Sequence, residues 1–239
     1  MKQNYRFADV IISAEFSGSY IKHQCREYET CLPAVTNIEI TPEDIVFERE
    51  YAKKTFPDVQ NMSDGYLESV SFHRNLAREL STYGVIIIHA SAVMLDGTAY
   101  LYSAPSGVGK STHARLCRQM FGNRVEIIND DKPFLRRTKE GIFVYGSPWD
   151  GKHRLSRNIR APLGGICLLN RGKDNSIEPV SFKDALPNLI SRTYIPSDEI
   201  QAEKVMEVLC SLSGVKIWDL HCNVAPDAAL LSLNTMKRS

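Results

Sequence analysis

A short segment, Ala104–Thr112, carries two glycines, a lysine and three hydroxyl residues between an apolar stretch and a helix-like stretch. An apolar stretch ends just before it at Tyr102, and a helix-like stretch follows it to Phe121. Gly107 and Gly109 allow the backbone to curl so that successive N–H groups point inward. The helix that follows adds its positive N-terminal end. The segment therefore predicts a phosphate-binding turn in a strand–turn–helix unit of an α/β protein.

The residues of this turn match a pattern that holds a nucleoside triphosphate. Lys110 is placed to reach the β- and γ-phosphates, and the Ser111 hydroxyl is placed to bind Mg²⁺. The usual G-x-x-x-x-G-K-[ST] pattern begins with glycine, whereas this chain has Ala104, which fits an ordinary backbone conformation. The alternative is a loop that happens to precede a lysine. The sequence predicts a site for ATP and Mg²⁺ at Ser106, Gly107, Val108, Gly109, Lys110, Ser111 and Thr112.

Two adjacent aspartates, Asp130 and Asp131, follow the short apolar stretch Val125–Ile128 downstream of the loop. Mg²⁺ prefers oxygen ligands and usually takes one or two carboxylates, so one aspartate can bind the metal. The other can accept a proton from an attacking hydroxyl. Neighbouring residues of a strand point to opposite faces, so both reach one site only if residues 129–131 form a turn. The alternative is a solvated turn, which Asn and Asp favour in any case.

Three further features each have two interpretations. His89 follows an apolar stretch, where it is either a hydrogen-bonded core residue or, if its strand lies beside the loop strand, a neighbour of the phosphates. The segment Gly146–Lys152 is predicted to be a stiff, exposed loop, either simply solvated or clamping phosphate through Lys152 or Arg154. Arg192 ends a predicted helix, where it either offsets the helix dipole or stabilises transition-state charge.

The rest of the sequence predicts two regions with a boundary near residue 84. Residues 1–84 form an α+β region, with strands in 5–17 and 37–51 and a helix over 65–82 that Asp64 caps. Residues 85–239 form the nucleotide core and end in a polar tail. Its strands are predicted near 85–95, 98–103, 125–128, 133–137, 142–145, 163–169 and 215–220, and its helices near 111–121, 181–192 and 197–213.

Composition excludes several classes of protein. Hydrophobic residues make up 43% and charged residues 24% of 239 residues, as in a soluble globular protein. The net charge of +1 gives no reason to expect nucleic acid or a lipid surface as partner. Apolar stretches such as Val85–Ile88 are too short to span a bilayer, and Met1–Phe7 lacks the apolar part of a signal peptide. The six cysteines lack a C-x-x-C pair. We therefore expect free thiols in the cytoplasm, and no zinc site at Cys210, His221 and Cys222.

Taken together, His89–Val93, Ser106–Thr112 and Asn129–Asp131 resemble, in order and spacing, the catalytic domain of the HPr kinase/phosphorylase family. The Gly-Ser-Pro-Trp-x-Gly loop at 146–151 is similar to that of bacterial HPr-kinase-like proteins often associated with peptide-modification gene clusters. The resemblance covers about residues 85–220. It implies a P-loop kinase fold, related to phosphoenolpyruvate carboxykinase, with a mixed sheet flanked by helices and a smaller N-terminal α+β region.

The same resemblance implies ATP- and Mg²⁺-dependent transfer of the γ-phosphoryl group to a serine-type hydroxyl of a peptide, protein or small molecule. It implies that Lys110 and Ser111 bind the triphosphate and the metal. Asp130 then binds Mg²⁺, Asp131 acts as the general base, and His89 lies near the transferred phosphate. The signature loop that serves the phosphorylase reaction is not recognisable in this chain, so neither that reaction nor HPr as acceptor is implied.

Two other functions can be compared with a kinase. A non-catalytic ATP-binding sensor needs no second carboxylate beside the metal ligand, whereas this chain supplies Asp131. An ABC-type transporter ATPase shares Ser-Gly-x-Gly-Lys-Ser-Thr, but the chain has no Leu-Ser-Gly-Gly-Gln signature. Residues 1–84 hold no catalytic motif, and we expect them to recognise the acceptor or a partner. A homo-oligomer is compatible with the sequence.

Overall fold

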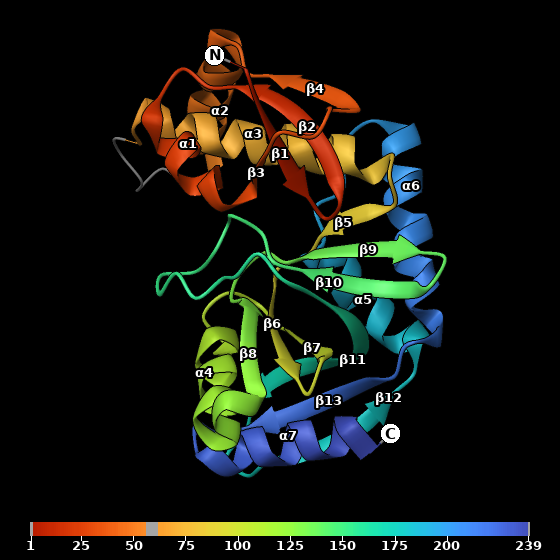
Figure 1. Ribbon diagram of the computed structural model, residues 1–239. Helices are drawn as coiled ribbons and strands as arrows, with labels where there is room; N and C mark the ends of the chain where they lie inside the picture. The colour runs from red at the N-terminus through yellow and green to blue at the C-terminus, as the bar shows by residue number, and fades with distance from the viewer. Residues whose placement is uncertain (1, 56–61, 239) are drawn as a thin grey trace. The chain divides into compact units, whose positions relative to one another are not determined.

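The computed structural model describes residues 2–55 and 62–238. The chain divides into two compact units, Met1–Tyr83 and Gly84–Ser239 (Figure 1). In the described part of the N-terminal unit, four strands form a sheet in the order β3-β1-β2-β4. The elements are β1 (Gln3–Phe7), β2 (Val10–Glu15), α1 (Ser19–Cys25), η1 (Arg26–Tyr28), β3 (Glu29–Thr30), β4 (Thr36–Glu39), α2 (Pro42–Thr55) and α3 (Asp64–Ser81).

The expectation of strands over 37–51 is wrong for most of that range. β4 ends at Glu39, and α2 begins at Pro42. Thr41 and Asp44 form a capping box, because the Thr41 N–H donates to Asp44 Oδ2 at 2.8 Å and the Asp44 N–H donates to Thr41 Oγ1 at 3.3 Å. Proline fits the first turn of a helix because its missing N–H is not needed there. The sequence thus contained a helix-start signal that the β-branched residues around it obscured.

The helix predicted over 65–82 is α3, and its cap differs from the expectation. Ser63 is the N-cap, and its hydroxyl oxygen accepts a hydrogen bond from the Tyr66 N–H at 3.3 Å. Asp64 is the first helical residue instead of the cap, a position where its negative charge favours the helix dipole.

The C-terminal unit is built on a mixed sheet with helices on both faces, as expected. Its central strands are β7 (Thr98–Ser103), β11 (Arg160–Arg171) and β13 (Ile217–Cys222), which are parallel neighbours. β6 (Ala90–Leu95) lies antiparallel between β7 and β8 (Val125–Asn129). β7 and β8 therefore run in the same direction and end at the edge where β6 begins. β8 is not a direct neighbour of the loop strand β7, because β6 lies between them.

The first half of β11 pairs with β10 (Gly141–Tyr145), which belongs to a second group of strands. On the side away from β11, β13 pairs with β12 (Ser176–Val180). The apolar stretch 85–95 is interrupted at His89 and contributes to both groups, because its first part pairs with β9. The remaining elements are β5 (Val85–Ile87), α4 (Lys110–Phe121), η2 (Gly122–Arg124), β9 (Phe134–Thr138), α5 (Phe182–Arg192), α6 (Glu199–Ser211), η3 (Leu212–Gly214) and α7 (Pro226–Arg238).

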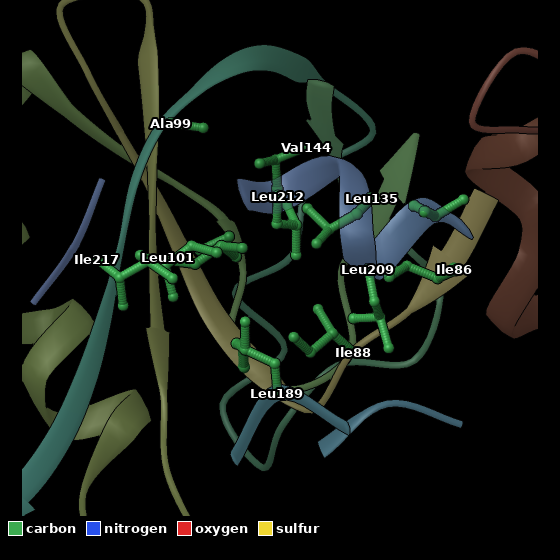
Figure 2. Close-up of a cluster of buried hydrophobic side chains, with 14 of the residues drawn as sticks. Ile86, Ile88, Ala99, Leu101, Leu135, Val144, Leu189, Leu209, Leu212 and Ile217 are labelled. Atoms are coloured by element: carbon green, nitrogen blue, oxygen red, sulfur yellow. The ribbon is translucent and has the colours of Figure 1, made fainter. Parts of the chain in front are cut away.

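Two apolar clusters hold the helices against the sheet. Figure 2 shows the first, in which Leu189 of α5 and Leu209 of α6 pack with strand residues such as Leu101. The second joins α4 and α7 to the other face, where Tyr100 and Tyr102 point. Successive residues of β7 thus serve opposite clusters, as strand geometry requires.

The polar tail expected after residue 220 is wrong, because α7 occupies Pro226–Arg238. Ala229, Leu233 and Met236 are buried, and their spacing of four and three residues matches one face of a helix. Ser239 lies outside the described residues. β12 was also not expected from the sequence. Among the described helices, none has the length and apolar character needed to cross a bilayer.

A buried polar network joins α4 to α7. His113 Nε2 lies 2.9 Å from Ser232 Oγ, which lies 3.0 Å from the Tyr102 hydroxyl. The rings of His113 and Tyr102 are 4.4 Å apart between centroids. Burial lowers the pKa of His113 to about 4, because a charged imidazolium would lose its hydration there. His113 is therefore neutral in the folded protein at pH 7.

This pKa predicts that the protein loses stability on acidification. The unfolded chain protonates His113 below about pH 6.5, whereas the folded chain does so only near pH 4, so stability falls as the pH drops through this window. Between pH 7.5 and pH 5.0 the loss from this residue is about 2 kcal/mol. Urea unfolding at both pH values should show a smaller pH dependence in His113→Gln than in wild type. An equal dependence in both proteins would contradict the assignment.

Candidate functional site

The predicted site residues meet at one edge of the central strands. β7 and β8 end at this edge with Ser103 and Asn129, and β6 begins there with Ala90. The Ala90 N–H donates to the carbonyl oxygen of Asp131 at 3.0 Å, which joins the start of β6 to the turn after β8. The crevice outside the carboxyl ends of strands is where open α/β sheets bind ligands.

The loop between β7 and α4 turns at two glycines with positive φ, Gly107 at 79° and Gly109 at 126°. A Cβ at either position would meet no atom within 4 Å, so the backbone conformation and not crowding requires glycine. Arg171, the last residue of β11, donates from its guanidinium to the carbonyl oxygens of Gly107 and Val108. This arginine lies outside the motifs that the sequence predicts for the site. The neighbouring strand β11 therefore holds the loop through Arg171, and the space beside the two glycines stays empty of protein atoms.

The other predicted loop residues differ in exposure. Ser106 and Thr112 are exposed, and Val108 and Ser111 are half-buried. Ala104, which stands where the usual pattern has glycine, is buried, and its φ is not positive. The helix that follows begins at Lys110, one residue earlier than expected.

Lys110 folds back over the loop and is only 6% exposed. Its Nζ donates to the carbonyl oxygens of Ala104 at 2.9 Å and Pro105 at 3.2 Å. Burial lowers the pKa of Lys110 to about 8, while the charge of Asp131 raises it and that of Arg192 lowers it. The ammonium is thus still mostly protonated at pH 7. A buried cation whose hydrogen bonds go to neutral carbonyl oxygens favours the arrival of an anion.

The residues after β8 form the turn that both aspartates need to reach one site. The side-chain oxygen of Asn129 accepts hydrogen bonds from the N–H groups of Asp131 at 2.8 Å and Lys132 at 2.7 Å. The carbonyl oxygen of Asp130 accepts a hydrogen bond from Ser111 Oγ at 3.1 Å. This hydrogen bond joins the acidic turn to the first turn of α4, which also contains Lys110.

Asp130 is 1% exposed, and its two carboxylate oxygens differ. Oδ1 accepts a hydrogen bond from the Gly151 N–H at 2.7 Å. Oδ2 is buried, and no hydrogen-bond partner for it lies among the described residues. An unsatisfied buried oxygen of this kind costs about 1–3 kcal/mol or more. This oxygen therefore fits a site for a cation.

The set of donors around Asp130 suits Mg²⁺ better than a metal with an all-protein cage. In the described part of the chain, no three His, Cys, Asp or Glu side chains are grouped to hold a metal ion. Mg²⁺ commonly uses one or two carboxylates together with phosphate oxygens and waters. Asp130 and the nearby Ser111 hydroxyl meet that requirement.

Asp131 lies beside two positive or hydrogen-bonding groups. Its Oδ1 is 3.2 Å from His89 Nε2, and its Oδ2 is 3.3 Å from Lys132 Nζ. Burial acts to raise the pKa of Asp131, but the hydrogen bond from His89 and the charge of Lys132 outweigh it and hold that pKa below its usual range. Asp131 is therefore ionised at neutral pH.

His89 and Arg192 are brought to the same place by the backbone. The His89 N–H, in the break between β5 and β6, donates to the carbonyl oxygen of Arg192 at 2.7 Å. Arg192 ends α5, and its charge is close enough to lower the pKa of Lys110. The two residues that the sequence left with open interpretations thus lie near the loop lysine and the acidic pair.

The 146–151 loop differs from the expectation of an exposed segment. Ser147 is fully buried and Trp149 is 7% exposed. Lys152 and Arg154, one of which clamps phosphate in the second interpretation of this loop, are both exposed. The loop instead reaches the pair through the Gly151 N–H. Serine and glycine are common in surface loops, so the residue types of this segment do not indicate its burial.

Comparisons with known proteins give a distant structural similarity. No protein-family model matches the chain, and no curated protein matches its sequence. Among solved structures, that of the Hpr(Ser) kinase/phosphatase from Coxiella burnetii is similar to this chain. The match covers 64% of this chain and 93% of the kinase/phosphatase chain. The sequence identity is 10% and the TM-score is 0.36. At this identity and TM-score the similarity carries no argument about this chain.

The contact between His89 and Asp131 leads to a prediction that needs no ligand. His89→Ala removes a hydrogen bond that lowers the Asp131 pKa, so this pKa should rise. Carbon NMR titration of the aspartate carboxyl groups measures it, with Asp131→Asn identifying the signal. His221→Ala is the matched control, because His221 lies beside a different aspartate, Asp219. An unchanged Asp131 pKa in His89→Ala would show that the contact does not set it.

Proposed function

We propose that this chain is an ATP- and Mg²⁺-dependent kinase that phosphorylates a serine-type hydroxyl of a peptide, protein or small molecule. One observation carries the proposal: a glycine loop with a buried lysine lies beside two adjacent aspartates in different environments. Asp130 has a buried oxygen without a described partner, whereas Asp131 is held ionised next to His89. Such a division fits one carboxylate for metal binding and one for proton transfer.

The phosphate end of ATP is assigned to the loop. The N–H groups around Gly107 and Gly109 and the N-terminus of α4 supply donors and positive dipole. Lys110 supplies a charge that burial makes more effective, because it is poorly screened by water. Ser111 and Asp130 would hold Mg²⁺, which neutralises phosphate charge when bound.

Asp131 is assigned to the acceptor. Its carboxylate takes the proton of the acceptor hydroxyl while the hydroxyl oxygen bonds to the γ-phosphorus. The bond from that phosphorus to the bridging oxygen breaks, and ADP leaves with the electron pair. His89 is assigned to orienting Asp131 and keeping it ionised. Arg192, whose charge acts on Lys110, is assigned to stabilising the negative charge of the transferring group.

The proposal predicts a loss of transfer without a loss of binding in Asp131→Asn. The amide cannot accept the hydroxyl proton, so phosphoryl transfer should fall about 10²–10⁴-fold. ATP affinity should remain within a few-fold. Incubation with ATP, Mg²⁺, candidate peptides, free serine and cell extract, followed by mass spectrometry for one added phosphoryl group, identifies an acceptor for the assay. Transfer near the wild-type rate would exclude Asp131 as the base.

Replacing Lys110 with alanine should weaken ATP binding about 10–100-fold and slow transfer, because a charge-assisted contact is lost. Titration calorimetry with ATP measures the affinity. Lys183→Ala is the control, since Lys183 is an exposed lysine near the start of α5. Unchanged affinity in Lys110→Ala would exclude the loop as the phosphate site. ATP binding with no transfer to any acceptor would favour a non-catalytic sensor.

A further inference from the structure

We infer that the 146–151 loop is a positioning element of the acidic pair, with Asn129 as its anchor and Gly151 as its contact to Asp130. The role that we infer for this loop is toward Asp130 and not toward the substrate. It fixes the direction of the carboxylate that would bind the metal. The inference deepens the proposed function and rests on it, and it gives a role to a segment that the sequence left unassigned.

The anchor is the fully buried side chain of Asn129. Its Nδ2 group lies within hydrogen-bond distance of the carbonyl oxygens of Ser147 at 3.2 Å and Trp149 at 3.3 Å. Its Oδ1 holds the turn through the N–H groups of Asp131 and Lys132. One side chain thus binds the loop with its donor end and the acidic turn with its acceptor end. Moving either segment would leave a buried amide unsatisfied, which is costly.

Ser147 makes the same connection from the other side. Its hydroxyl lies 2.6 Å from the carbonyl oxygen of Lys132, to which it donates, and 3.1 Å from Asn129 Nδ2, from which it accepts. The Trp149 N–H also donates to this hydroxyl oxygen at 3.2 Å. The loop and the acidic turn therefore share a hydrogen-bond network whose members are all buried or half-buried.

The start of the loop is fixed by close packing. The Gly146 N–H donates to the carbonyl oxygen of Ile159 at 3.0 Å. A Cβ at Gly146 would lie 1.8 Å from the carbonyl oxygen of Arg157 and 3.1 Å from that of Ile128. No other residue leaves room for this approach. Glycine at 146 therefore allows the start of the loop to lie close to the backbone of Arg157 and of Ile128 in β8.

The end of the loop meets the metal carboxylate. The Gly151 N–H donates to Asp130 Oδ1, and a Cβ on Gly151 would lie 2.7 Å from Asp130 Oδ2 and 3.0 Å from its Cγ. The φ of Gly151 is not positive, so alanine fits its backbone conformation and would act only through this contact. Gly151 thus holds one oxygen of Asp130 and leaves room for the other.

This arrangement explains why Asp130 is buried yet has one oxygen without a described partner. A carboxylate bound at both oxygens by the protein would have little to offer a cation. A single N–H on Oδ1 fixes the side-chain orientation and keeps the negative charge of Oδ2 available. Partners that orient a metal ligand typically change metal affinity or activity 10–100-fold when they are removed.

The test is Gly151→Ala compared with wild type and Gly214→Ala. A Cβ at Gly214 would meet no atom within 4 Å, and the φ of Gly214 is not positive, so this variant makes the same chemical change without a contact. Calorimetry measures ATP affinity in excess Mg²⁺ and in EDTA. We expect Gly151→Ala to bind ATP about tenfold more weakly in Mg²⁺ and within about twofold of wild type in EDTA. Gly214→Ala should match wild type in both.

Two results would overturn the inference. Gly151→Ala could keep the full Mg²⁺-dependent gain in affinity, which would show that the contact does not orient a metal ligand. It could also lose affinity equally in EDTA, which would show a general distortion of the loop. If wild-type protein binds no ATP in either condition, the proposed function fails, and the metal-orienting role fails with it.

A second measurement tests the contact without nucleotide. Gly151→Ala should lower the thermal midpoint by a few degrees in the wild-type background, because the new methyl group crowds the carboxylate of Asp130. In an Asp130→Ala background this loss should largely disappear. An equal loss in both backgrounds would show that Gly151 does not act through Asp130, whatever the ATP measurements give.

Discussion

A primary amide without access to water must satisfy both its donor and its acceptor from the surrounding chain, and at Asn129 this requirement joins two segments. The donor end holds the carbonyl oxygens of Ser147 and Trp149, and the acceptor end holds the turn with Asp131 and Lys132. The low local polarity makes each of these bonds harder to give up. The turn that carries the acidic pair is therefore joined to the 146–151 loop through the side chain of Asn129.

The two aspartates share a turn but not an environment. Asp130 is buried beside Gly151. Among the described residues, its carboxylate accepts a hydrogen bond only from the Gly151 N–H. Asp131 is flanked by His89 and Lys132, which overcome the effect of burial on its pKa. Separate environments are what allow two identical side chains to take different parts in one reaction. The buried ammonium of Lys110 lies close to one negative charge, that of Asp131, and to one positive charge, that of Arg192.

Local signals in the sequence identified most elements of the C-terminal unit, and the errors have clear causes. The stretch 85–95 reads as one strand, yet His89 interrupts it, because its two halves pair with different strands. Lys237 and Arg238 give the end of the chain a polar character, although the buried residues of α7 are spaced as on one face of a helix. Over 37–51, the β-branched residues favour a prediction of strands, whereas the capping box at Thr41 and Asp44 marks the start of the helix α2.

The sequence by itself determined the loop, because glycine at positive φ, a following lysine and a helix start are all encoded within a few neighbouring residues. It also named Asp130 and Asp131 and required them to lie in a turn. Only the tertiary structure decided that β6 lies between β7 and β8, and that the 146–151 loop is buried against Asn129. Those contacts join residues distant in the chain, and backbone approach such as that at Gly146 depends on packing that no local pattern records.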